Sequence, residues 1–184
     1  MRRLAAVLVV TLAAALLPHA ARPAQPEAIS RADQLTAAYI VNFAKFVEWP
    51  AHATPDILTL CIEGADGVRG ALLAHAGEKL FGHRSLTLRA IRSSDSLEGC
   101  DVLFVDAHLT TPVRMPPLSS GASPRSVLTI GDQPEFAHHG GVIELFTQDN
   151  RLRFKVNVGN AKRAGLHISS ALLELASSVE KDSQ

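Results

Sequence analysis

The segment AAYIVNFAKFVEWP, residues Ala37–Pro50, decides the fold because it concentrates bulky aromatic side chains in one short stretch. It holds the only Trp and the only Tyr of the chain and two of its seven Phe. At helical spacing the large side chains gather near one face, which is typical of a helix that packs on a sheet. The members of this stripe are Leu35, Ala38, Tyr39, Asn42, Phe43, Phe46 and Val47.

Both ends of this helix carry a sequence signal. Ser30 lies three residues before Asp33, so the hydroxyl can accept from a first-turn N–H while the carboxylate favours the positive end of the helix. Trp49 precedes Pro50, and a residue before proline is pushed out of the helical region. The sequence therefore predicts a helix that begins near Ser30 and stops at Trp49-Pro50.

Four aromatic residues of this segment support two interpretations. They can be core residues only, or they can form an aromatic surface, at the edge of the core, that a partner contacts. The residues are Tyr39, Phe43, Phe46 and Trp49. We expect a structural role first, with the Phe46 ring buried.

The bulk composition indicates one globular domain with no charge-driven partner. The 184 residues are enough for a sizeable core. Lys and Arg number 18 and Asp and Glu number 18, so the formal net charge is zero. Nothing in this balance favours nucleic acid or an anionic membrane as a partner.

The N-terminus reads as a secretory signal. Arg2 and Arg3 precede the unbroken apolar run Leu4–Leu17, which is short for a membrane span but typical of a signal peptide. We expect export, cleavage of the signal and a soluble mature protein. The expected division is a signal peptide at residues 1–25, a linker and helix start at 26–34, and one domain at 35–180.

The chain has two cysteines, Cys61 and Cys100, and both follow the signal. In an oxidising compartment two lone cysteines are typically bonded to each other. Two buried free thiols are the alternative. A metal site is not expected, because no His or Cys partners stand at ligand spacing.

Short apolar runs alternate with helical patterns along the rest of the chain. This indicates an α/β single-domain sandwich, with a mostly parallel central sheet, an antiparallel edge hairpin and helices on the faces. The expected strands are 57–62, 86–91, 101–106 and 126–130, and the hairpin is 142–146 with 152–156. The expected helices are 68–76, 160–164 and a last one that carries Ile168, Leu172, Leu175 and Val179. Residues 108–125, rich in Pro, read as a loop.

No catalytic or cofactor motif emerges from the polar residues. Gly64, Gly67 and Gly70 match neither the dinucleotide fingerprint nor the phosphate-binding loop, so a tight strand-to-helix turn explains them better than a ligand. The adjacent pair His138-His139 reads as a solvated loop rather than a metal site.

Three carboxylates stand at strand ends, where sites often form. They are Asp106, Asp132 and Glu144. A catalytic pair needs a geometry that spacing cannot supply, and Asx-turn bonding is a sufficient explanation for Asp132. We expect no enzyme, no cofactor and no metal.

With these segments placed, the chain resembles the YfiR family of exported bacterial proteins over residues 35–176. Four blocks carry the resemblance. The first is AAYIVNFAKFVEWP at Ala37–Pro50, and the second is the cysteine-bearing pair LTLCIEG at Leu58–Gly64 and EGCDVLFV at Glu98–Val105. The third is LTIGD at Leu128–Asp132, which continues to GGVIELF, and the fourth is RLRFKVNVGNAKRAGLHISSALLELA at Arg151–Ala176.

The resemblance implies a non-catalytic periplasmic regulator. YfiR proteins bind and repress the sensor region of an inner-membrane diguanylate cyclase, which lowers cyclic di-GMP signalling and biofilm growth. Relatives can form homodimers and can be sequestered by an OmpA-like outer-membrane lipoprotein. This chain lacks the second cysteine pair of some relatives. A periplasmic small-ligand-binding or sensing module, with a pocket near Gly64–Gly70 or at the strand ends, is the alternative.

Overall fold

The structure is a computed structural model, and it describes residues 29–50, 56–75, 79–81, 84–92, 94–107 and 126–181. The expected signal peptide and the expected loop at 108–125 lie outside these residues. No helix of the described part is long and apolar enough to cross a bilayer.

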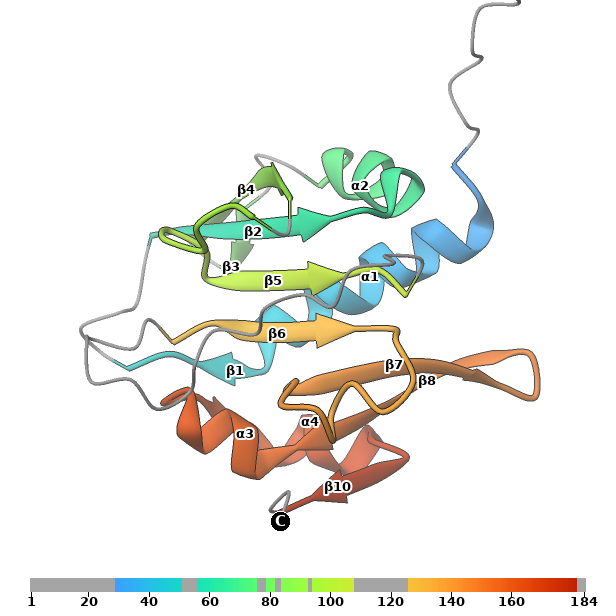
Figure 1. Cartoon of the computed structure of the whole chain (residues 1–184), viewed down its shortest axis with the longest axis vertical. Helices are drawn as coiled ribbons and strands as arrows, with labels where there is room; N and C mark the ends of the chain where they lie inside the picture. The colour runs from blue at the N-terminus through green and yellow to red at the C-terminus, as the bar shows by residue number, and fades with distance from the viewer. Residues whose placement is uncertain are drawn as a thin grey trace, which may run out of the picture.

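An eight-stranded sheet organises the described residues, in the order β10-β8-β7-β6-β5-β2-β4-β3 (Figure 1). Its strands are β2 (Ile57–Glu63), β3 (Lys79–Phe81), β4 (Arg84–Ile91), β5 (Val102–Val105), β6 (Leu128–Gly131), β7 (Ile143–Gln148), β8 (Arg151–Asn157) and β10 (Ser178–Glu180). Five of the seven neighbouring pairs are parallel, and β3–β4 and β7–β8 are antiparallel. This confirms the α/β class and the hairpin, with β10 added beyond it.

The helices are α1 (Arg31–Lys45), α2 (Asp66–Leu73), α3 (Val158–Arg163) and α4 (Ser170–Leu175). Their buried hydrophobic residues all belong to one core cluster, and α1 lies behind β5 and β6 in the view of Figure 1. A separate two-stranded ribbon joins β1 (Val47–Glu48) to β9 (His167–Ile168). The ribbon fastens the segment after α1 to the segment after α3.

Helix α1 begins as expected and ends earlier than expected. The Ser30 hydroxyl accepts from Asp33 N–H at 3.1 Å, and the Asp33 carboxylate accepts from Ser30 N–H at 2.9 Å, a complete capping box. The predicted stop at Trp49-Pro50 is wrong, because the helix ends at Lys45 with Phe46 as its C-cap. The chain then enters β1, whose pairing with β9 holds it extended.

The predicted apolar stripe is correct only in part. Its Phe43 and Val47 are buried, Ala38 and Tyr39 are half-buried, and Leu35, Asn42 and Phe46 are exposed. The buried residues of α1 are Ala37, Ile40, Val41, Phe43 and Ala44. Leu35 is 45% exposed and Phe46 is 36% exposed. Since Phe46 has already left helical geometry, its ring does not follow the stripe, and our expectation that it is buried is wrong.

The expected last helix is replaced by three short elements. Ile168 lies in β9, Leu172 and Leu175 in α4, and Val179 in β10. The Ser169 hydroxyl caps α4, and the backbone of Ala176 is extended, which ends the helix after six residues. The steps of three and four between these apolar residues are therefore not one helical face.

The two faces of the sheet carry separate apolar clusters. The larger one contains the side chains under the helices, among them Leu60, Phe104 and Ile130. The smaller one is formed by Cys61, Ile91, Cys100, Leu103, Val105, Val127 and Phe136. A disulfide joins Cys61 to Cys100 inside the smaller cluster, which confirms the expected pairing and leaves no free thiol among the described residues.

Candidate functional site

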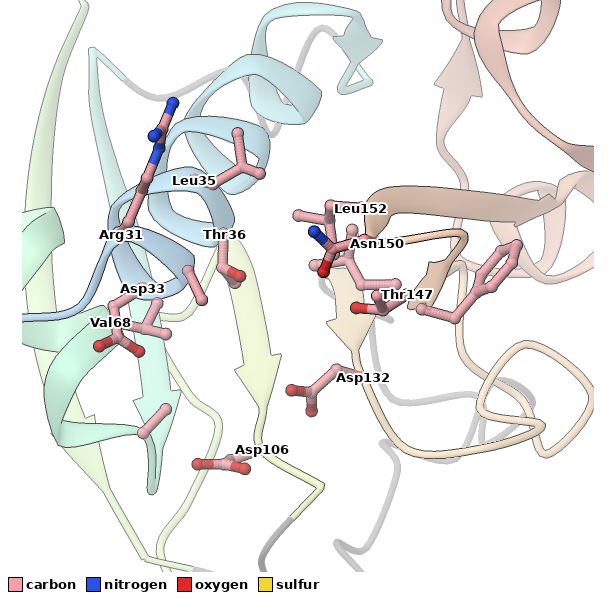
Figure 2. Close-up of a pocket in the computed structure, with 14 residues that line it drawn as sticks. Arg31, Asp33, Leu35, Thr36, Val68, Asp106, Asp132, Thr147, Asn150 and Leu152 are labelled. Carbon is pink, nitrogen blue, oxygen red and sulfur yellow. The ribbon is translucent and has the colours of Figure 1, made fainter.

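A cleft of about 770 Å³ opens between the start of α1 and the β7–β8 hairpin (Figure 2). The base of the cleft is formed where β5 and β6 end, at Asp106 and Asp132. The lining residues are Arg31, Ala32, Asp33, Leu35, Thr36, Ala65, Val68, Asp106, Asp132, Leu145, Phe146, Thr147, Asn150 and Leu152. Its volume falls within the range of ligand sites in proteins, about 300–1,000 Å³.

The topology explains why a cleft forms at this place. After β2 the chain crosses to β4 on one side, and then returns to β5 on the other side of β2. The connections thus leave the sheet in opposite directions at the β2–β5 boundary. In open parallel sheets, ligands bind in the crevice outside the carboxyl ends of the strands at such a switch point.

Helices α1 and α2 form one wall and approach each other closely. A side chain on Gly67 would place its Cβ 2.5 Å from a carboxylate oxygen of Asp33, and one on Gly70 would place it 3.1 Å from Ile29 Cδ1. Gly64, with a φ of 72°, makes the turn that leads into α2. The expected turn is present at Gly64. The close contact that Gly67 and Gly70 allow between α2 and the start of α1 was not expected from the sequence.

Asp106 and Asp132 are neighbours at the base of the cleft. They follow Val105 and Gly131, which pair across β5 and β6. The Ala107 N–H donates to Asp132 Oδ1 at 2.6 Å, and the Gln133 amide donates to the Asp106 carbonyl at 3.1 Å. Asp132 therefore links the two strand ends, which is a longer-range role than the Asx turn we expected.

The β7–β8 hairpin forms the opposite wall. Its turn has Asp149 and Asn150 at φ values of 50° and 56°, residue types that tolerate this left-handed conformation. Thr147, Asn150 and Leu152 from the hairpin face the cleft. The Tyr39 hydroxyl donates to the Leu152 carbonyl at 3.2 Å, so α1 and the hairpin are tied together beside the cleft.

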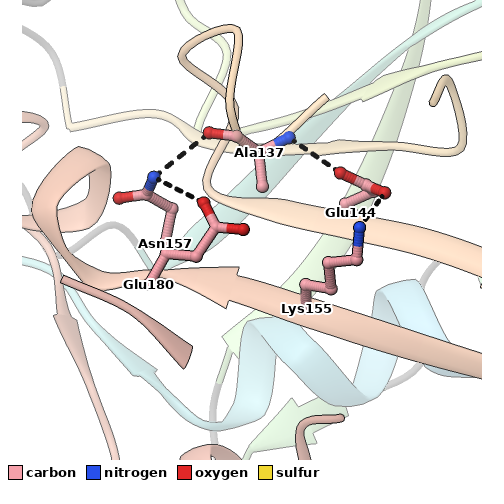
Figure 3. Close-up of polar contacts among 5 residues, drawn as sticks. All are labelled: Ala137, Glu144, Lys155, Asn157 and Glu180. Carbon is pink, nitrogen blue, oxygen red and sulfur yellow. Dashed lines mark hydrogen bonds and ion pairs between the residues drawn. The ribbon is translucent and has the colours of Figure 1, made fainter. Parts of the chain in front are cut away.

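Glu144, the third strand-end carboxylate, lies in a different environment (Figure 3). It accepts from Lys155 Nζ at 2.9 Å and from Ala137 N–H at 3.2 Å. On the same side of the hairpin, the Asn157 amide donates to the Ala137 carbonyl at 3.2 Å and to Glu180 at 3.3 Å. This network joins the β6–β7 loop, the hairpin and β10, and its contacts support a structural role.

The four aromatic residues do not share one surface. Phe43 is buried, and its ring lies 4.8 Å from that of Phe154 and 5.7 Å from that of Tyr39, centroid to centroid. Trp49 is also buried, and its indole N–H donates to the Ser126 carbonyl at 2.9 Å. Tyr39 is half-buried. Phe46 alone of the four is exposed.

Arg89 holds the loop that carries Cys100. Its guanidinium donates to the carbonyls of Ser96 and Glu98 at 3.1 and 2.8 Å, and to Cys100 Sγ at 2.8 Å. Among the described residues, no group of three His, Cys, Asp or Glu side chains could hold a metal ion. His138 and His139 are exposed and stack edge to face.

The sequence profile of the YfiR/HmsC-like family matches residues 33–177. The chain belongs to this family. Membership supports a regulatory role in the periplasm. No curated protein matches the chain.

Two solved structures are similar to part of this chain. One is a conserved domain protein from Vibrio cholerae, with 10% identity and a TM-score of 0.47 over 80% of this chain. The other is an ABC domain from Streptococcus pneumonia in complex with L-Trp, with 11% identity and a TM-score of 0.49 over 78% of this chain. The match spans 60% of the length of each of these two chains.

Proposed function

We propose that this chain is a non-catalytic periplasmic regulator that binds and represses the sensor region of an inner-membrane diguanylate cyclase. The YfiR/HmsC-like match over residues 33–177 carries this proposal. Its physical basis is a population shift, because a protein that binds the inactive sensor more tightly than the active one holds the enzyme off. The extent of repression is set by the difference between the binding free energies of the regulator for the inactive and the active sensor.

The exposed Phe46 ring is the aromatic group that supports a partner contact at the end of α1. It is 36% exposed, whereas Phe43 and Trp49 are in the core. The Phe46 carbonyl accepts from Ser169 N–H at 2.9 Å, so the backbone beneath the ring is held by the segment before α4. A rigid, partly exposed aromatic side chain contributes large contact area at little entropic cost.

Cyclic di-GMP levels test the repression. Deleting the gene should raise cyclic di-GMP and surface attachment, and a second deletion that removes the cyclase should abolish the rise. The exported protein should restore the low level, and a version that starts at Ala28 should not, because it stays outside the sensor's compartment. An unchanged level in the single deletion would contradict repression. A rise that persists in the double deletion would show that the target is a different protein.

A small-ligand-binding or sensing module is the second candidate, and the cleft at the switch point favours it. The cleft combines apolar walls with polar groups that converge from α1, β5, β6 and the hairpin. Such a combination is typical of small-molecule sites. Native mass spectrometry of the protein released from the periplasm tests it, because an occupied fraction carries a discrete added mass. A single unliganded mass would contradict a tightly bound resident ligand.

A further inference from the structure

We infer that the face of the β7–β8 hairpin opposite the helices binds an acidic side chain of a protein partner, through the guanidinium of Arg153. The inference rests on the proposed function, because a repressor of this kind holds its partner by direct contact. It is carried by a half-buried cation that has no counter-ion among the described residues, by the aromatic side chain beside it and by the small number of cations nearby.

The alternation of side chains along β8 defines this face. Phe154 and Val156 belong to the core under the helices, so the side chains between and before them point to the other side of the sheet. Those side chains are Arg151, Arg153 and Lys155. The register with β7 is continuous along the strand, and every residue of the hairpin lies in the described part of the chain.

The charge of Arg153 is not balanced by the described part of the chain. The residue is half-buried, and its Nε–H is shielded from water without an acceptor. Its guanidinium makes no hydrogen bond or ion pair with the rest of the protein that the structure describes. A charged group that loses water without gaining a partner is costly. An anion that supplies the missing acceptor would therefore be bound favourably.

Arg89 is the contrasting case, an arginine whose guanidinium is used by the chain itself. Its Nε is also shielded and without an acceptor. Its terminal nitrogens, however, donate to two carbonyls and to Cys100 Sγ. Arg89 is therefore committed to its loop. Arg153 makes no such contacts with the described residues, so its terminal nitrogens are open to a ligand.

An aromatic residue and an ion pair stand next to Arg153. Phe146 lies directly across the ladder from it. Lys155 Nζ stands 5.3 Å from the centre of the Phe146 ring and pairs with Glu144 at 2.9 Å (Figure 3). Lys155 is thus already neutralised, and the unpaired charge of this face is that of Arg153 and the exposed Arg151. Arginine and aromatic residues are enriched among the side chains that dominate binding in protein interfaces.

The number of these cations favours a protein partner over a polyanion. Nucleic acid and anionic lipid surfaces are bound through clusters of cations, about four to eight of them for a lipid surface. The described residues of this face supply only two that are unpaired, Arg151 and Arg153. A planar guanidinium binds a carboxylate through two parallel N–H···O bonds, and Phe146 offers apolar contact beside it. The group that fits is an Asp or Glu side chain on the surface of the partner.

A titration of the purified chain followed by NMR tests this contact with a defined probe. The probe is the blocked peptide acetyl-Leu-Glu-Leu-amide, and its control has Gln in place of Glu. The Nε–H resonance of Arg153, identified by its loss in Arg153→Met, should shift with the Glu peptide only. The shift should shrink as salt is raised, because an ionic contact is screened. Equal shifts with both peptides, or none with either, would overturn the inference. A larger shift with phosphatidylglycerol vesicles would assign the face to a membrane instead.

Arg153→Met separates a binding role from a structural one. Because it replaces a shielded, unpaired cation by an apolar side chain, the melting temperature should stay the same or rise, whereas loss of a structural arginine would lower it. Arg92→Met is the matched control, since Arg92 is exposed just after β4, far from β8 in the strand order. Affinity for the Glu peptide should fall at least several-fold in Arg153→Met only. A melting temperature lower by several degrees, or equal affinity in both variants, would overturn the inference.

Binding to the periplasmic region of the cyclase separates this inference from the function on which it rests. The unmodified chain should bind that region, and Arg153→Met should bind it at least several-fold more weakly. Equal binding by both would overturn the inference and keep the repressor function. If the unmodified chain does not bind, repression of the cyclase is contradicted, and a shift with the Glu peptide would support an acidic contact from a different protein.

Discussion

The two faces of the central sheet are stabilised in different ways. On one face the helices contribute a large continuous core that includes Phe43, Phe104 and Ile130. On the other face a small apolar cluster surrounds the Cys61–Cys100 bond. The comparison indicates that one face depends on the quality of side-chain packing, and that the other depends on a covalent link and on the Arg89 contacts to its loop.

The helix-covered face should show the largest loss on truncation. Phe43→Ala removes a ring that is 2% exposed and that packs on Phe154, so we expect the free energy of unfolding to fall by about 3–5 kcal/mol. Urea denaturation measures it. Leu35→Ala, on the same helix and 45% exposed, is the control and should cost less than about 1 kcal/mol. Similar losses in both variants would contradict the assignment of this face as the main core.

The disulfide face should respond to loss of the bond with an intermediate effect. Replacing Cys61 and Cys100 together by Ala releases a link across 39 residues, and we expect a loss of about 2–4 kcal/mol with a midpoint lower by several degrees. Calorimetry of the variant and of the unmodified chain measures the difference. Thiol labelling of the denatured, unreduced protein is the control, and two reactive thiols per chain would refute the bond.

Phe46→Ala should have the smallest effect on stability. The ring is 36% exposed and the residue's backbone contact to Ser169 is retained, so we expect less than about 1 kcal/mol. Melting curves and cyclic di-GMP levels should be measured together. Signalling that rises while the melting curve is unchanged would place the ring in a partner contact. Ile57→Ala removes another exposed apolar side chain and should leave signalling unchanged. A large drop in stability would instead return Phe46 to the core.

The elements that sequence alone predicted are those with local signals. The Ser30 and Asp33 capping box, the apolar runs of β2 and β5 and the turn at Asp149-Asn150 all lie within a few neighbouring residues. Strands β1 and β9 have two residues each and exist because they pair with each other. No local pattern could show them, and for that reason the ends of α1 and α4 were misplaced.

The candidate site was predictable in part. Asp106 and Asp132 were identified as strand-end carboxylates, but only the strand order could bring them together. Glu144 pairs with Gly131 on the next strand, yet its side chain bonds Lys155 and Ala137 instead. No sequence signal showed that Thr147 and Leu152 of the hairpin would line the cleft. Whether these residues reach the cleft depends on how far the hairpin extends past the ends of β5 and β6.

The hydrogen bond between the Tyr39 hydroxyl and the Leu152 carbonyl has a consequence for the order in which the chain can fold. These residues are 113 positions apart, and the Trp49 bond to Ser126 spans 77. Helix α1 is therefore made early in synthesis, but its packing partners emerge late. Closing such long loops makes folding slow. If the chain is exported as proposed above, this delay has a use, because the first helix cannot pack into a finished core before the last strands have crossed the membrane.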